Sequence, residues 1–406
     1  MYIIPLHKTL PTLYQSKKDK NLNNYYQVAA RLLFNALRFR YFKFRSIPLK
    51  PTVVSLAVTN RCNSHCIMCN IWKIARDNPE LKSLELSSQK IIRILYSRLF
   101  TELVELDLTG GEPHLRDDLV DIVLGIARLK KNHLPKLRSI VITSNGFLTR
   151  QVISNYKDIL YALRDTNIDL VSVTSIDGIG DIHDQIRGTA GAFKLASKTI
   201  SRLSELRQEY PNLIPGIKTT ILPQNVDVLD SILNFALSNN LFHIISPVLF
   251  TEARFRNTDK RDEVMLAPSE YKKILDFYCR DELKTSYFYA KGLSSLAAGQ
   301  KHWSCTAMYN YAFIDFDGKV YPCEIIPNPI GNVKEQDIED IWNSAQARLW
   351  RKNIGKLECC QTCHEPGAIR YSAFTEGLNY LKFLTKLGKR GYKASLHGEG
   401  FLKYIS

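Results

Sequence analysis

The sequence predicts an α/β fold in which a parallel sheet is followed by a small hairpin-and-helix region. Short apolar runs alternate with amphipathic helical stretches from about residue 52 to 250. This alternation is typical of a parallel sheet with right-handed crossovers. It supplies six strand–helix units. Farther on, apolar residues alternate on both sides of Asp317-Gly318, which predicts a β-hairpin.

The predicted elements follow one another in order along the chain. Strands are expected near 53–58, 103–108, 138–143, 169–174, 213–221 and 243–247. Helices are expected between them near 86–99, 117–130, 149–164, 191–208 and 226–239. After the hairpin, residues 338–350 predict one further helix. The 406 residues suffice for one large domain and a small second one.

Three cysteines, Cys62, Cys66 and Cys69, follow the first predicted strand with the spacing Cys-x3-Cys-x2-Cys. A cubane iron–sulfur cluster takes four soft thiolate ligands. Three thiolates from one loop leave the fourth iron open to a small molecule, which indicates a site for chemistry. The alternative is a structural zinc loop to which His65 adds a ligand, although zinc sites usually pair Cys-x2-Cys units.

Small and polar residues follow the next three predicted strands. They are Gly110, Gly111 and Glu112, then Ser144, then Ser175. Open sheets and barrels bind ligands beyond the carboxyl ends of their strands. Glycines there let the backbone approach a ligand closely, and Glu112 offers an anionic acceptor for an ammonium group. Farther on, the planar guanidinium of Arg187 suits a carboxylate.

The cysteine triad, the segment 109–113 and the segment 183–188 together resemble the radical S-adenosylmethionine (SAM) superfamily. The resemblance implies a partial, open (β/α)6 barrel with a 4Fe–4S cluster whose open iron chelates SAM. It also implies that Gly110, Gly111 and Glu112 hold the amino group of the methionine moiety. Ser144, Ser175 and Arg187 then face the ribose and carboxylate. Met68 stands where many relatives have an aromatic residue over the adenine, and a thioether also packs on a ring.

A second group of cysteines lies near the C-terminus. Cys305 and Cys323 flank the predicted hairpin, and the following helix leads back to Cys360 and Cys363. Four thiolates from three elements predict a second, closed cluster, with a structural zinc as the alternative. The pattern resembles the twitch domain of radical SAM enzymes, whose longer SPASM relative carries seven cysteines and two clusters. We therefore expect one auxiliary 4Fe–4S cluster on these four cysteines, with Cys359 as the alternative to Cys360.

These features divide the chain into five expected parts. They are a basic amphipathic segment (1–49), the radical SAM barrel (50–255), a connecting segment (256–299), the auxiliary-cluster domain (300–366) and a second basic amphipathic segment (367–406). The sequence contains no secretory signal and no apolar run long enough to span a bilayer. We therefore expect the nine cysteines to serve in the cytoplasm, mainly as metal ligands rather than in disulfides. Cys279, which stands alone, is expected to be buried.

The net charge of +15 is concentrated at the two ends of the chain. In the first segment an apolar side opposes a basic one, and the last segment repeats this. The two apolar sides consist of Tyr25, Val28, Ala29, Leu32, Leu33 and Ala36, and of Tyr380, Leu381, Leu384 and Leu387. Basic amphipathic helices suit an anionic membrane, so we expect peripheral contact with its inner face. The alternatives are helices packed on the barrel and, less favoured without a recognisable RNA-binding module, a nucleic-acid partner.

The resemblance implies an enzyme that reductively cleaves SAM to a 5′-deoxyadenosyl radical and abstracts hydrogen from an unactivated carbon. It also implies an electron donor such as flavodoxin or ferredoxin, and an auxiliary cluster that assists net oxidation or bond formation. No residue is assigned a catalytic role. The basic ends favour a lipid or lipid-linked substrate over other small molecules. The alternatives are a maturase of ribosomally made peptides and a non-catalytic iron–sulfur binding or regulatory protein.

Overall fold

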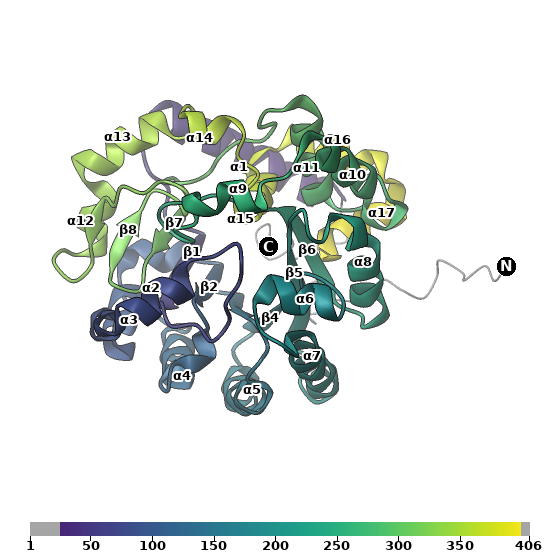
Figure 1. The fold of residues 1–406 in the computed structure, drawn as a ribbon. Helices are drawn as coiled ribbons and strands as arrows, with labels where there is room; N and C mark the ends of the chain where they lie inside the picture. Colours follow the sequence, from purple (N-terminus) through teal and green to yellow (C-terminus); the bar gives the residue numbers. More distant parts are fainter. Residues whose placement is uncertain (1–24, 399–406) are drawn as a thin grey trace.

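A computed structural model describes residues 25–398 and is built on one large sheet (Figure 1). The strand order is β6-β5-β4-β3-β2-β1-β7-β8-β9. The first six strands are parallel, each beside the one before it: β1 (Val53–Thr59), β2 (Glu105–Gly110), β3 (Ser139–Ser144), β4 (Asp169–Ser175), β5 (Leu213–Ile221) and β6 (Phe242–Pro247). This order is that of an open partial barrel, and the predicted fold class is confirmed.

Five helices that follow the strands form the outer layer of the barrel in Figure 1. They are α3 (Ser88–Leu95), α4 (Leu119–Leu129), α5 (Thr149–Leu163), α7 (Ala192–Glu209) and α8 (Leu229–Ser238). In α4 the buried residues Leu119, Ile122, Val123 and Ile126 recur at helical spacing, so one apolar stripe faces the sheet. The main hydrophobic core therefore lies between the sheet and these helices.

The inner face of the sheet is polar. Ser55 donates a hydrogen bond to Asp107, and Ser139 donates one to Glu105, each across neighbouring strands. The short helix α15 (Pro366–Ser372) covers this face, and its Tyr371 hydroxyl donates to Glu105 at 3.4 Å. The C-terminal part of the chain thus contacts the interior of the barrel.

The predicted hairpin is present and extends the barrel sheet. Its strands β7 (Tyr311–Ile314) and β8 (Lys319–Tyr321) are antiparallel, and β9 (Gly331–Asn332) pairs with β8. β7 also pairs in parallel with β1. The predicted helix over 338–350 is instead two helices, α12 (Ile338–Asn343) and α13 (Ala345–Asn353). They separate at Ser344, whose backbone is extended and whose hydroxyl accepts a hydrogen bond from the Ala347 amide.

Further α-helices lie around the mouth of the barrel and on the side formed by the C-terminal part of the chain (Figure 1). They are α2 (Ile71–Asp77), α6 (Asp181–Arg187), α9 (Arg261–Val264), α10 (Pro268–Tyr278), α11 (Tyr287–Ala298), α14 (Glu358–Gln361), α16 (Leu378–Lys386) and α17 (Gly388–Gly398). Within the part of the chain that the structure describes, no helix has the length and apolar character needed to cross a membrane.

Helix α1 (Tyr25–Phe44) has two apolar faces, and residues 25–398 cover one of them. Its inner face packs against α16 and the short 3-10 helix Ala373–Thr375, and buries Val28, Leu32, Ala36 and Phe39. Val28, Leu32 and Ala36 are three of the six residues on the side that the sequence predicted to face a membrane, so that prediction is wrong for these three, which pack on the protein instead. Tyr380 and Leu384 of α16 are likewise fully buried. The outer face of α1 exposes Tyr26, Phe34, Leu37, Tyr41 and Phe44 by 57–88%.

Candidate active site

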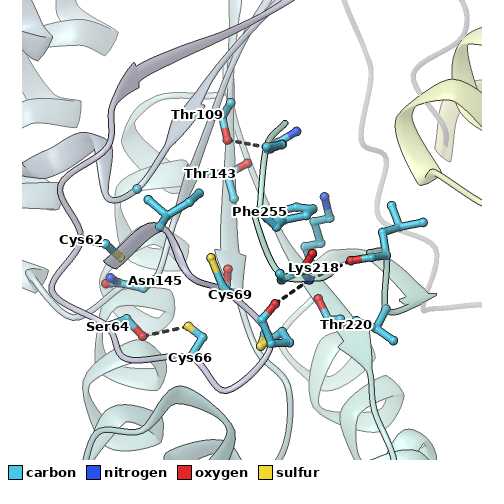
Figure 2. Close-up of a pocket in the computed structure, with 18 of the residues that line it drawn as sticks. Cys62, Ser64, Cys66, Cys69, Thr109, Thr143, Asn145, Lys218, Thr220 and Phe255 are labelled. Carbon is cyan, nitrogen blue, oxygen red and sulfur yellow. Dashed lines mark hydrogen bonds between the residues drawn. The ribbon is translucent and has the colours of Figure 1, made fainter. Parts of the chain in front are cut away.

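The loop that carries the three cysteines lies between β1 and α2, across the carboxyl ends of the parallel strands (Figure 2). Its first part is tied to the end of β2, because the Gly111 and Glu112 amides donate to the Thr59 and Arg61 carbonyls at 2.8 and 2.7 Å. A Cβ atom on Gly110 or Gly111 would lie 2.1 Å from one of these carbonyl oxygens. The two glycines are therefore required by the close approach of the cysteine loop.

The second part of the loop is held by the end of α6. The His65 and Ile67 amides donate to the Arg187 and Ile186 carbonyls, each at 3.0 Å. Gly188 follows with a positive φ of 59°, and a Cβ there would lie 2.4 Å from the His65 carbonyl oxygen. The sequence indicated α6 through Arg187 but not this backbone pairing.

The last part of the loop is held by the segment after β6. The Asn257 side chain donates to the Met68 carbonyl at 2.8 Å, and the Asn70 amide donates to the Phe255 carbonyl at 3.1 Å. Three separate parts of the barrel thus fix the backbone that carries the cysteines.

Cys62, Cys66 and Cys69 are free thiols that line one cavity (Figure 2). The Cys66 sulfur lies 3.1 Å from the Ser64 hydroxyl and accepts a hydrogen bond from Arg187 Nη1 at 3.4 Å. Burial raises the pKa of Cys62 and raises that of Cys69 to about 12. Burial thus favours the neutral thiols, and a bound metal cation would favour the thiolates.

The cavity encloses about 1080 Å³ of space between the atoms, part of it open to solvent. Six residues predicted from the sequence as cofactor-binding line it: Met68, Gly110, Gly111, Ser144, Ser175 and Arg187. Met68 belongs to an apolar cluster with Ile186, Leu222 and Val248. A flat, weakly polar ring suits this wall.

Glu112 lies behind the residues that line the cavity. Its carboxylate accepts hydrogen bonds from the Ser144 hydroxyl at 3.0 Å, the Asn145 amide at 2.8 Å and the His114 amide at 3.1 Å. Burial raises the pKa of Glu112 to about 7 even though these donors lower it. In this structure Glu112 orients Ser144 and Asn145, and its predicted contact with an ammonium group stays a prediction.

Arg187 is held by the carboxylate of Asp177. Its Nη2 lies 2.5 Å from Oδ2 of the fully buried Asp177, which also accepts a hydrogen bond from the Thr220 amide at 2.7 Å. Asp177 thus positions the guanidinium beside Cys66. A carboxylate of a bound cofactor would meet a cation that is already oriented.

Four charged residues that line the cavity were missed by sequence reasoning. They are Lys218, Arg254, Glu324 and Glu365. Arg254 forms an ion pair with Glu324 and donates to the Thr109 hydroxyl at 2.7 Å. Signals for three of them were present, because Lys218 interrupts an apolar strand, and the two glutamates follow Cys323 and Cys363 by one and two residues.

The C-terminal cysteines line a second cavity of about 470 Å³. Cys305, Cys323, Cys360 and Cys363 come from the loop before β7, the end of β8, α14 and the turn after α14. Cys359 also lines this cavity, but it is exposed whereas Cys360 is buried. Cys279 is exposed, so the prediction of its burial is wrong.

Both cysteine groups supply the donors that iron–sulfur clusters take, since they are free, buried or half-buried thiols gathered around cavities. Among residues 25–398, no three His, Cys, Asp or Glu side chains converge on the position of a single metal ion. A cubane binds each thiolate at a different iron, so its ligands need not converge on one point. The two donor sets therefore fit four-iron clusters.

Comparison with known proteins agrees with this geometry. Residues 56–231 match the radical SAM superfamily, and residues 305–364 match SPASM, an iron–sulfur cluster-binding domain. The chain carries a radical SAM domain followed by a SPASM domain. This pair implies a 4Fe–4S cluster and SAM in the first domain and an auxiliary iron–sulfur cluster in the second. The predicted family, fold class and cofactors are confirmed.

Two curated relatives span most of the chain. An AdoMet-dependent heme synthase of Methanosarcina barkeri is 26% identical over 359 residues, which cover 82% of this chain and 95% of that protein. The sporulation killing factor maturation protein SkfB of Bacillus subtilis is 26% identical over 327 residues, covering 76% and 70%. Among solved structures, Streptococcus suis SuiB bound to S-adenosylmethionine has a TM-score of 0.54 at 14% identity, covering 77% of this chain and 70% of that one. The last likeness concerns the fold.

Proposed function

We propose that the protein is a radical SAM enzyme that oxidises an unactivated carbon of a substrate bound between its two cysteine groups. The observation that carries the proposal is the arrangement of the cavities. The large cavity extends from the cysteine loop to Glu324 and Glu365, and these two glutamates also line the second cavity. A substrate in the large cavity would therefore contact both domains.

The first cluster would bind to Cys62, Cys66 and Cys69, and the auxiliary cluster to Cys305, Cys323, Cys360 and Cys363. When bound, the first cluster with SAM supplies a 5′-deoxyadenosyl radical that abstracts hydrogen, and the second supplies an acceptor for the electron left on the substrate. A reduced flavodoxin or ferredoxin would serve as the electron donor.

The side chains of the cavity would bind and orient the reactants. Ser144, Ser175 and Arg187 line the large cavity and would hold the polar groups of SAM. Arg254, which forms an ion pair with Glu324, and Lys218 line the same cavity and would bind polar groups of the substrate. The surrounding barrel limits the access of water, which protects a reactive radical from side reactions.

A peptide is one candidate substrate class, and the similarity to SkfB, a maturation protein of a sporulation killing factor, supports it. A lipid or lipid-linked small molecule is the second. It is supported by the exposed aromatic face of α1, which would bring the protein to the surface where such substrates reside.

The proposal is tested with anaerobically reconstituted protein, a chemical reductant and SAM. We expect release of 5′-deoxyadenosine, and we expect a faster release when the substrate is added. An extract of cells that produce the protein is divided into a peptide fraction and a lipid fraction, and each is assayed. Stimulation by one fraction assigns the substrate class. A protein that binds iron but releases no 5′-deoxyadenosine with any fraction would instead be a non-catalytic iron–sulfur protein.

A further inference from the structure

The outer face of α1 carries an exposed apolar stripe that is continuous along the helix. Tyr26, Phe34, Leu37, Tyr41 and Phe44 recur at intervals of three, four and eight residues, so they fall within one narrow sector of the helix. Their side chains are 79, 64, 67, 57 and 88% exposed. From Tyr26 to Phe44 the stripe is about 27 Å long at the rise of an α-helix.

This stripe is distinct from the surface that fastens α1 to the protein. Val28, Leu32, Ala36 and Phe39 form the buried face, and they lie on the opposite side of the helix. Folding of the chain therefore does not require large apolar side chains on the outer face. Exposed apolar patches of this size and continuity mark interaction surfaces.

The stripe is bordered by positive charge. Arg31, Arg38 and Arg45 recur every seven residues along one border, Arg40 lies on the other, and all four are exposed. The sequence contains no Asp or Glu from residue 25 to residue 50. The neighbouring helix α16 adds the exposed lysines Lys382 and Lys386. The partner of this surface must therefore combine an apolar interior with a negatively charged surface.

We propose that the outer face of α1 docks the protein on the surface of an anionic lipid bilayer. The aromatic and leucine side chains would enter the boundary between headgroups and acyl chains, and the arginines would remain among the lipid phosphates. A second copy of this chain fits less well, because pairing the same face would oppose two rows of arginines. A nucleic acid would use the arginines but would leave Leu37 and the centre of the stripe without apolar contacts.

The test is flotation of the full-length protein with vesicles of phosphatidylcholine alone and of phosphatidylcholine mixed with phosphatidylglycerol. We expect flotation with the mixed vesicles, little with phosphatidylcholine, and release by salt. Phe34→Ser/Phe44→Ser should reduce partitioning by about tenfold or more. Arg38→Gln/Arg45→Gln should reduce it about 30-fold, since each arginine near the surface contributes about 1 kcal/mol.

Matched controls use residues of similar exposure elsewhere on the surface. Tyr161→Ser/Leu349→Ser removes two exposed apolar side chains, and Arg128→Gln/Arg150→Gln removes two exposed arginines. Both should float like the unaltered protein, and circular dichroism establishes that every variant is folded. Equal loss of flotation in control and α1 variants overturns the proposal. An absence of flotation with the mixed vesicles also overturns it. In that case, loss of binding to an RNA oligonucleotide in the α1 variants would indicate a nucleic-acid partner, and dissociation of a dimer in sedimentation would indicate a second copy of this chain.

Discussion

The two cysteine groups of this protein differ in how far apart their members lie along the chain. The first group occupies one loop, residues 62–69, and backbone hydrogen bonds from three parts of the barrel hold that loop. The second group spans residues 305–363 and depends on β7, β8 and α14 being placed correctly. The first lines a large cavity with room for reactants, and the second lines a smaller one. A local loop thus provides the proposed site of radical formation, whereas long-range folding provides the auxiliary site.

The largest effect should come from removing a cysteine of the first group. Cys66→Ala removes the thiol that lies beside Ser64 and Arg187, and we expect 5′-deoxyadenosine release to fall to background because SAM cleavage requires this cluster. Chromatographic measurement of 5′-deoxyadenosine in anaerobic assays checks this. Cys279→Ala removes an exposed cysteine outside both groups and should retain full activity. Persistent release by Cys66→Ala would refute the assignment of the loop.

The second group should affect a different step. Cys305→Ala/Cys323→Ala removes two thiols on either side of the hairpin, so bound iron should fall by about four atoms per chain. SAM cleavage should continue, because the loop at 62–69 is unchanged, while formation of the oxidised product should stop. Iron analysis and 5′-deoxyadenosine release measured on one preparation separate the two sites. An unchanged iron content would show that these cysteines hold no cluster.

A smaller effect should follow from disturbing the backbone beside the first group. The added methyl group of Gly111→Ala would lie 2.1 Å from the Arg61 carbonyl oxygen, so the cysteine loop or β2 must shift. Overpacking of this kind costs about 1–3 kcal/mol, and we expect SAM affinity to fall by about tenfold or more. Equilibrium dialysis measures the affinity. Gly125→Ala in α4 meets only the flexible tip of Ile92 and should bind SAM normally. Equal affinities in the two variants would contradict the role of the close approach.

The difference between local and long-range order also explains what could be predicted from the sequence. The six parallel strands and the residues at their ends were predictable because apolar runs and fixed spacings are local signals. Three features depend on contacts between distant segments. They are the pairing of β7 with β1, the ion pair of Arg187 with Asp177, and the place of Lys218 in the cavity that the cysteine loop also lines. No spacing within one segment encodes them.

Helix α1 shows the same limit on a smaller scale. Its sequence contains two apolar stripes, and helical periodicity identifies stripes without telling which one the protein covers. The stripe with Val28 and Leu32 was predicted to be the free one and is buried, whereas Phe34 and Phe44 are exposed. Which stripe is covered depends on α16, which lies more than 300 residues away along the sequence. Only the folded structure distinguishes the two faces.

The smallest effect is expected at the cysteine that the second group does not need. Cys359 is exposed and Cys360 is buried, although both line the same cavity, so we assign Cys360 as the ligand. Cys359→Ala should therefore leave iron content and product formation unchanged, while Cys360→Ala should lose iron from the auxiliary site. Because the two residues are neighbours on α14, each variant is the control for the other, and any general distortion of this helix would affect both. The reverse result would assign Cys359 as the ligand and would require α14 to rotate when the cluster binds.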